Sequence, residues 1–194
     1  MANDAQADEI ARRYRYLFPA LDRCREEGLS VLTTLLGQVG QFHLARGRLT
    51  EPRVKPLRSV QDKALTNGWQ PDEALERTTD LVGFRIVCNN IEDAYRIKDA
   101  ILGSPRFLAA ESDVQDYIAS PQPSGYRAIH INAKYEVMGL DKVAVPCEIQ
   151  VRTLTQEAWA QLSHYDLYKQ GESLAPHIAK SALRLSALLH VGTV

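Results

Sequence analysis

The chain has 194 residues, of which 45% are hydrophobic and 24% charged; this is typical of one packed domain and excludes a disordered or fibrous chain. Its 23 Lys and Arg residues against 24 Asp and Glu residues exclude the bulk charge with which proteins coat long nucleic acids or acidic membranes, so any basic site must be local. There is no basic N-terminal segment followed by an apolar run and no long apolar stretch, so we expect a cytoplasmic protein with no membrane partner.

The first part of the chain has a helical pattern. Apolar residues recur at helical spacing from Asp8 to about Arg46, and because Pro19 interrupts them we interpret this region as two helices. The alternation of residues 53–55 then predicts a short strand. From Leu57 to Leu65 the apolar residues fall on one side of a helix, and Gly68 is expected to end it.

Strand patterns follow in the centre of the chain. The segments Leu81 to Cys88, Ala128 to Val137 and Val143 to Arg152 are rich in β-forming residues or alternate between apolar and polar residues. Helical spacing between Asn90 and Leu102, and again from Thr155, places helices around the strands. The pattern therefore predicts an α/β (α+β) fold in which helices flank a central sheet.

We expect a single domain with three segments: an N-terminal helical segment over residues 1–50, a core over 51–170 and a C-terminal helix over 171–194. The Leu-rich stretch near residues 178–189 fits packing into the core, or assembly as a homo-oligomer. The three cysteines are widely spaced and form no C-x-x-C pair, so we expect reduced thiols in the core.

Polar side chains share one face of two predicted strands. A period of two places Glu148, Gln150 and Arg152 together, opposite an apolar face, and His130 of the preceding strand falls on the same side. Such a face is either the solvated outside of a sheet or the floor of a site. Just before that strand, a Pro/Gly/Ser loop delivers Tyr126, whose ring is placed either to pack or to stack on a base.

A local basic cluster, formed by Arg53, Lys55, Arg58, Ser59 and Lys63, lies at the start of the predicted core. Arg53 and Lys55 share a strand face, and Ser59 and Lys63 share a helix face, so cations and a hydroxyl can converge on a polyphosphate. No Walker pattern is present, so side chains and not a glycine loop would hold the phosphates. The alternative is an exposed basic helix edge.

Two carboxylates are candidates for a metal site. Asp80 precedes one predicted strand and Glu148 lies in another, so they can meet if the strands are neighbours. Mg²⁺ takes one or two carboxylates and completes its coordination with phosphate oxygens and water. Solvated acids at strand ends are the alternative.

Taken together, these motifs resemble the synthetase domain of RelA/SpoT enzymes, in particular the small alarmone synthetases and their toxic pyrophosphokinase relatives. The resemblance covers about residues 52–169, and its motifs are specific in combination although each is weak alone. They are R-x-K-x-x-x-S-x-x-x-K from Arg53 to Lys63, D-L-x-G-x-R from Asp80 to Arg85, G-Y-R-x-x-H from Gly125 to His130 and E-I-Q-x-R-T from Glu148 to Thr153.

The resemblance implies a mixed sheet of the nucleotidyltransferase type and a Mg²⁺-dependent pyrophosphokinase that moves the β,γ-pyrophosphate of ATP to the 3′-hydroxyl of GDP or GTP, which makes (p)ppGpp. It also implies the following roles: ATP binding by Arg53, Lys55, Ser59, Lys63 and Arg85; metal binding and catalysis by Asp80 and Glu148; acceptor binding by Tyr126, His130, Gln150, Arg152 and the loop residue Gln122.

One departure from the family pattern leaves the acceptor open. Gln122 stands where the family usually has lysine, which removes a cation expected near the acceptor's 5′ phosphates. Toxic relatives use adenine nucleotides or the 3′ end of tRNA as acceptors and imply an antitoxin partner, although the near-neutral charge argues against tRNA. A non-catalytic nucleotide-binding module is a further alternative.

Overall fold

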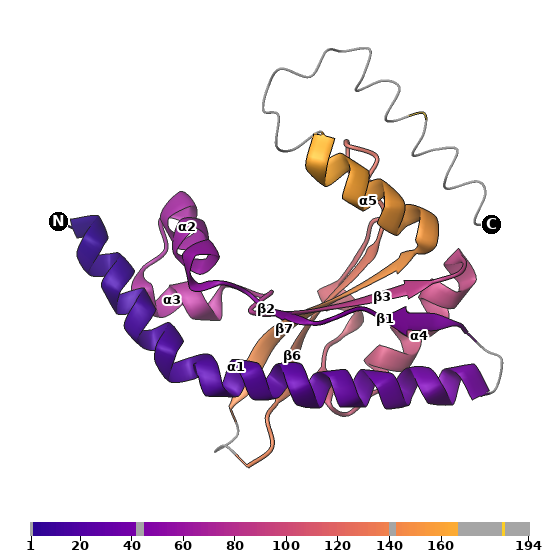
Figure 1. The fold of residues 1–194 in the computed structure, drawn as a ribbon, viewed down its shortest axis with the longest axis horizontal. Helices are drawn as coiled ribbons and strands as arrows, with labels where there is room; N and C mark the ends of the chain where they lie inside the picture. Colours follow the sequence, from indigo (N-terminus) through magenta and orange to yellow (C-terminus); the bar gives the residue numbers. More distant parts are fainter. Residues whose placement is uncertain (1, 42–44, 140–142, 167–183, 185–194) are drawn as a thin grey trace.

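The computed structural model describes residues 2–41, 45–139, 143–166 and 184. Within these ranges, strands form one seven-stranded sheet with the order β1-β3-β7-β6-β4, in which β2 pairs with β3 and β5 with β6 (Figure 1). The strands are β1 (Gly47–Leu49), β2 (Arg53–Val54), β3 (Val82–Cys88), β4 (Phe107–Leu108), β5 (Val114–Asp116), β6 (Ile129–Glu136) and β7 (Ala144–Thr153). The helices are α1 (Ala2–Gln41), α2 (Leu57–Asn67), α3 (Pro71–Glu76), α4 (Ile91–Leu102), the 3-10 turn η1 (Glu111–Asp113) and α5 (Leu154–Asp166).

The sheet is mixed, which confirms the predicted fold class. β3 and β7 run parallel, with Gly83 opposite Glu148 and Arg85 opposite Gln150. The other pairs are antiparallel, and β6 places His130 opposite Gln150. This register brings the polar residues of three strands to one face of the sheet, because side chains alternate along each strand.

The two faces of the sheet are covered differently. Apolar side chains such as Phe84, Ile131 and Ile149 are buried on one face, against which α1 and α4 pack. α5 contacts β3 and β7 and lies on the other side of the sheet from α1 (Figure 1). The polar face is therefore the one that remains available for a site.

The N-terminal region is one helix and not the two that the sequence predicted. α1 runs continuously through Pro19, and it bends along its length (Figure 1). Proline removes one backbone hydrogen bond and favours a bend, but tertiary contacts hold the helix on both sides of it. Before the proline, the hydroxyl of Tyr14 donates to the Lys55 carbonyl at 2.7 Å, and after it Leu21 is fully buried.

Several smaller predictions are confirmed. Gly68 ends α2 with a φ of 66°, the left-handed conformation that glycine adopts without strain. Cys24, Cys88 and Cys147 are buried free thiols. The predicted C-terminal helix over residues 171–194 lies, apart from Arg184, outside the described residues. Among those that are described, no helix is long and apolar enough to cross a membrane.

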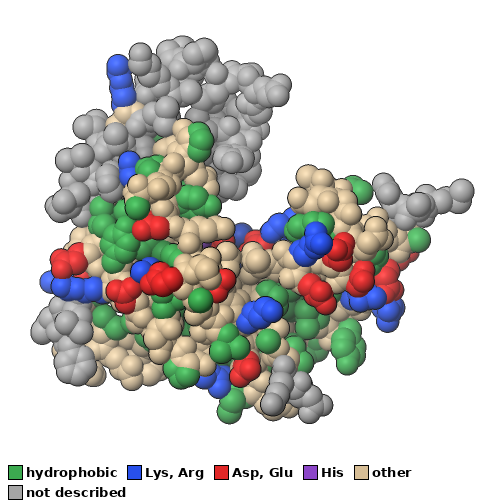
Figure 2. Space-filling view, turned by 180° about the vertical axis from the view of Figure 1, so that it is seen from behind, with side chains coloured by type: hydrophobic (Ala, Val, Ile, Leu, Met, Phe, Trp, Pro, Cys, Tyr) green, Lys and Arg blue, Asp and Glu red, His purple; other side chains and the backbone are tan. Residues whose placement is uncertain are grey.

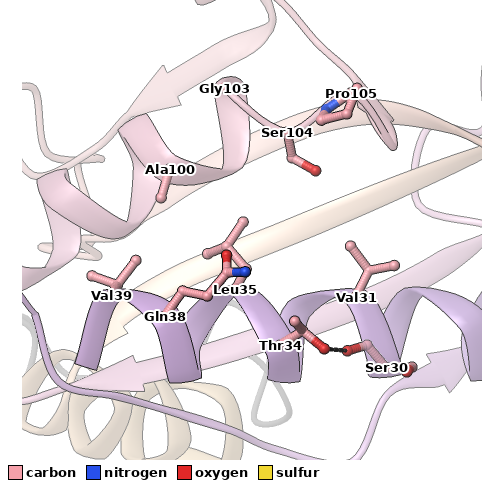
Figure 3. A pocket seen from close by; sticks show the side chains of 10 residues that line it. All are labelled: Ser30, Val31, Thr34, Leu35, Gln38, Val39, Ala100, Gly103, Ser104 and Pro105. Carbon is pink, nitrogen blue, oxygen red and sulfur yellow. Dashed lines mark hydrogen bonds between the residues drawn. The ribbon is translucent and has the colours of Figure 1, made fainter. Parts of the chain in front are cut away.

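A cavity of about 390 Å³ lies behind the sheet, between α1 and the end of α4 (Figure 3). None of the ten side chains that line it is charged, and the hydroxyl of Thr34 is bonded to the Ser30 carbonyl at 2.9 Å. This cavity therefore lacks the cations and carboxylates of the predicted site, which lies elsewhere.

Candidate functional site

A polar cavity of about 230 Å³ opens on the other face of the sheet. Seen from behind, the surface is hollowed between the parts of the molecule that hold α2 and α5 (Figure 2). The cavity is lined by residues from the β1–β2 loop, β2, β3 and β7: Thr50, Glu51, Arg53, Asp80, Gly83, Phe84, Arg85, Glu148 and Gln150. Both predicted metal ligands and both arginines predicted to bind ATP thus border one space.

Asp80 lies directly before β3 and is held by the basic cluster. One of its oxygens accepts a hydrogen bond from Nζ of Lys55 at 2.7 Å and the other from Nζ of Lys63 at 3.1 Å. Burial alone would raise the pKa of Asp80, but the hydrogen bonds and charges of the two lysines outweigh it, and the pKa is lowered. The carboxylate is therefore charged at neutral pH, and the two cations point toward it.

Glu148 is the second carboxylate of the cavity, and β7 directs it to the polar face. Its Oε1 is 3.0 Å from Nδ1 of His130, and its Oε2 accepts a hydrogen bond from the amide of Gln150. Burial would raise the pKa of Glu148, but the hydrogen bonds and charge of His130, together with the Gln150 amide, lower it; the charge of Asp80 opposes them. This repulsion from Asp80 is what two carboxylates around one cavity experience.

The hydrogen bonds around Glu148 close into a ring. Nη2 of Arg152 donates to the hydroxyl of Tyr126 at 2.6 Å and to the Gln150 side chain at 2.8 Å. The Tyr126 hydroxyl is 2.7 Å from Nε2 of His130. His130 thus joins the two branches, since its second ring nitrogen, Nδ1, is the one beside Glu148. The orientation of Glu148 is therefore set directly by His130 and Gln150, and Tyr126 and Arg152 hold these two in place.

Arg53 and Arg85 approach the cavity from adjacent strands. Arg53 lies opposite Gly83 in the β2–β3 pair, and its Cγ and Nε would be 3.5 Å from a Cβ at position 83. The absence of a side chain at Gly83 leaves the space along which Arg53 extends. Arg85 follows two residues later on the same face of β3, which gives the cavity a guanidinium from each strand.

Not every predicted site residue joins this group. Ser59 lies in the first turn of α2, and within the described ranges its side chain makes no hydrogen bond to Asp80 or to the lysines. Gln122 forms a tight turn through its backbone. Its backbone N–H donates to the Tyr126 carbonyl at 3.1 Å, and its backbone carbonyl accepts from the N–H of Gly125 at 2.8 Å. Neither residue lines the cavity, so their roles stay predictions.

Two contributors were missed by the sequence reasoning. Tyr117, at the end of β5, contacts His130 edge to face at a centroid distance of 5.3 Å and Tyr126 at 6.0 Å. Glu157, on α5, is 9% exposed and accepts hydrogen bonds from Arg85 and Arg152. An acidic residue in a helix and a tyrosine in the turn after a short strand give no signal in the sequence that distinguishes them from surface or packing residues.

The carboxylates fit a cation that takes its other ligands from a substrate. In the part of the chain that the structure describes, no group of three or more His, Cys, Asp or Glu side chains is arranged to hold a metal ion. Asp80 and Glu148 alone are too few for a protein cage, but Mg²⁺ binds through one or two carboxylates together with phosphates and water.

The fold and the cavity define the class of protein: a mixed α/β domain whose open sheet face carries two carboxylates, lysines and arginines. The chain belongs to the RelA/SpoT family, because the model of the region found in RelA / SpoT proteins matches residues 52–173, more than half of its length.

Comparison with individual proteins agrees with this family. GTP pyrophosphokinase YwaC of Bacillus subtilis is 29% identical over 144 residues, which are 73% of this chain and 68% of that protein. GTP pyrophosphokinase YjbM of the same organism is 31% identical over 135 residues, 69% of this chain and 63% of that protein. The crystal structure of small alarmone synthetase 1 from B. subtilis with its product pppGpp matches with a TM-score of 0.81 and 26% identity, covering 94% of this chain and 93% of that one.

Proposed function

We propose that this protein is an ATP-dependent 3′-pyrophosphokinase that makes (p)ppGpp from GDP or GTP. The 3′-oxygen of the acceptor forms a bond to the β-phosphorus of ATP, the bond between that phosphorus and the α,β-bridging oxygen breaks, and AMP leaves. The observation that carries the proposal is the meeting of Asp80, Glu148 and the cations of the basic cluster around one cavity. Relatives named GTP pyrophosphokinase support it.

The donor would occupy the side of the cavity formed by β2 and β3, beside Lys63 of α2. Arg53 and Arg85 would lie on the two faces of the adenine, since planar guanidinium groups stack on aromatic rings. Lys55 and Lys63, now bonded to Asp80, would turn to the phosphates when a divalent cation takes their place at the carboxylate. A crystal structure of small alarmone synthetase 1 with the ATP analogue AMPCPP, at 25% identity and a TM-score of 0.72, supports a nucleotide in such a fold.

Asp80 and Glu148 would hold Mg²⁺ between the donor phosphates and the acceptor. When bound, the ion neutralises the charge that develops on the transferred pyrophosphate. The lowered pKa of each carboxyl keeps both ligands charged at neutral pH. Glu148 would also take the proton from the acceptor 3′-hydroxyl, and its ring of hydrogen bonds fixes the direction in which it points.

The acceptor would lie next to the β7 side of the cavity, toward β6 and the loop before it. Tyr126 would stack on its base. The guanidinium of Arg152 lies over the Tyr126 ring, 5.1 Å from its centre, so a base would use the other face. His130, Gln150 and Arg152 would then support the acceptor through the same ring of hydrogen bonds.

The test is to offer the purified protein ATP labelled at the β- or γ-phosphate with GDP, GTP, ADP, AMP or deacylated tRNA, and to follow which 3′-end takes the label. We expect labelled ppGpp and pppGpp, and at least about 100-fold slower transfer by Asp80→Asn and Glu148→Gln. Glu92→Gln, on the exposed side of α4, is the control with the same loss of one charge. Transfer without Mg²⁺, or unchanged transfer by both site variants, would contradict the mechanism.

Gln122 favours a second acceptor class. An amide in place of a cation weakens the attraction for an acceptor with several 5′ phosphates. Label on AMP, ADP or the tRNA 3′ end, with little on guanine nucleotides, would identify this protein as a toxic type of pyrophosphokinase. Gln122→Lys should then increase transfer to GTP more than transfer to AMP.

A further inference from the structure

Glu157 lies between one arginine of the proposed donor site and one of the proposed acceptor site. Its Oε1 accepts a hydrogen bond from Nη1 of Arg85 at 3.0 Å, and its Oε2 accepts one from Nη1 of Arg152 at 2.8 Å. Burial would raise the pKa of the carboxyl, but the hydrogen bond of Gln161 and the charges of both arginines outweigh it and lower the pKa. One buried, charged carboxylate is thus shared by two guanidinium groups.

Arg85 depends on this carboxylate for its orientation. In the described ranges, the hydrogen bond of the Arg85 side chain goes to Glu157, and its Nε is buried without a partner. A guanidinium that stacks on a base must present a fixed plane, and a long side chain with no anchor loses that plane to rotamer freedom. Glu157 supplies the anchor, because it lies on the helix that covers this end of β3.

Arg152 is the second group that Glu157 fixes. Its other hydrogen bonds go to Tyr126 and Gln150. Gln150 bonds directly to one oxygen of Glu148, and Tyr126 is connected to the other through His130. A shift of Arg152 would therefore loosen both branches of the ring. Through Arg85 and Arg152, Glu157 connects the donor side of the cavity with the carboxylate proposed as the base.

We propose that Glu157 is a positioning residue for pyrophosphate transfer, which holds Arg85 for the donor base and Arg152 for the acceptor ring at the same time. The inference rests on the proposed function. Glu157 does not line the cavity, so it acts through the two arginines and not by contact with a substrate. Its loss should weaken the binding of both substrates, whereas a residue that only attaches α5 to the sheet would change stability alone.

The experiment uses Glu157→Gln in the full chain, with binding of a non-hydrolysable ATP analogue and of GDP measured by calorimetry. Glutamine keeps the shape, but one of its two polar ends donates and cannot accept from an arginine. We expect each nucleotide to bind about tenfold more weakly, since a hydrogen bond to a charged group is lost on one arginine and weakened on the other. Glu27→Gln is the matched control, because Glu27 accepts from Arg106 on the opposite face of the sheet.

Two double variants separate positioning from stability. In an Arg85→Ala background, Glu157→Gln should cause no further loss of ATP-analogue affinity, and in an Arg152→Ala background no further loss of GDP affinity. The inference would be overturned if Glu157→Gln alone kept wild-type affinities, or if it caused the same loss in these backgrounds as in the wild type. In either case, pyrophosphate transfer by the wild-type protein would still support the proposed function. A wild-type protein that neither binds the ATP analogue nor transfers label would overturn both.

Discussion

Arg53 illustrates what a single side chain contributes to this site. It is exposed, it extends along Gly83, and it shares the cavity with Arg85. A lysine would keep its charge but not the flat, weakly hydrated surface that lies on an aromatic base. The residue type therefore carries information that the charge alone does not.

Arg53→Lys should weaken binding of an ATP analogue about tenfold, which corresponds to the loss of one cation–π stacking contact. Titration calorimetry in the presence of Mg²⁺ measures the change. Arg58→Lys is the matched control: Arg58 is an exposed arginine of α2 that borders a different cavity, so its affinity change should stay below about twofold. Equal effects of the two variants would remove Arg53 from the donor site.

The charge of Glu148 should appear in the pH dependence of stability. Its pKa in the folded protein is below the ordinary value of 4.5, so the fold favours the charged form. The resulting stability is fully present above pH 4.5 and is lost as the pH falls through the folded pKa. His130→Phe removes one hydrogen bond while burial persists, so the pKa of Glu148 should rise toward its unfolded value; less stability should then be lost on acidification, and the loss should be complete at a higher pH.

Urea unfolding between pH 3 and 7 gives the free energy of unfolding of the wild type and of His130→Phe at each pH. Glu148→Gln cannot titrate at this position, so the change that His130→Phe causes in that background comes from the imidazole itself and is subtracted. If His130→Phe has the same profile as the wild type, the hydrogen bond does not hold the charge of Glu148.

At the scale of elements, helix α1 fixes the strand that carries the arginine. Gly28 of α1 is buried directly against the ring of Phe84, the β3 residue between Gly83 and Arg85. A Cβ at position 28 would lie 2.5 Å from Cζ of Phe84, which is 2% exposed and has little room to move. The close approach of helix and strand thus requires glycine at this position.

Gly28→Ala should lower the free energy of unfolding by about 1–3 kcal/mol, because overpacking of the core outweighs the gain in helix propensity. Gly37→Ala, in the same helix with nothing within 4 Å of its Cβ, should raise it by up to about 1 kcal/mol. Chemical denaturation of both variants gives the two values. Equal stabilisation by both would mean that α1 does not press on β3 as closely as described.

At the scale of the whole molecule, the sheet separates two kinds of surface. α1 and α4 bury one face, while the other carries the charged cavity in the hollow between the parts that hold α2 and α5 (Figure 2). A ligand in this cavity would contact β2 and β3 from the first part of the core and β7 from its last part. Its binding should therefore stabilise the domain as a unit.

An ATP analogue with Mg²⁺ at about 100 times its dissociation constant should stabilise the protein by about 2.7 kcal/mol and raise Tm by about 5–10 °C. Chelation of the metal with EDTA should reduce this rise, because the phosphates and the two carboxylates then repel one another. Calorimetric scans of the wild type and Asp80→Asn measure it. A rise that is independent of Mg²⁺ in the wild type would contradict a shared metal at Asp80 and Glu148.

Most of the longer strands and helices, and the residues that border the cavity, could be predicted from the sequence alone. Strict alternation in β6 and β7 identified the polar face, and Asp80, Arg85 and Glu148 followed from motifs with a fixed order. These signals are local: a period of two, a run of spaced cations or a short motif can be read without knowing what packs against it.

Features that depend on long-range contacts could not be predicted in this way. Pro19 predicted a break, but contacts on both sides keep α1 continuous, since packing overrides a local preference. β1, β4 and β5 are too short to give a pattern, and they exist because β3 and β6 pair with them. Glu157 is one acid among many in the sequence, and it acquires its partners only when α5 folds back over the ends of β3 and β7.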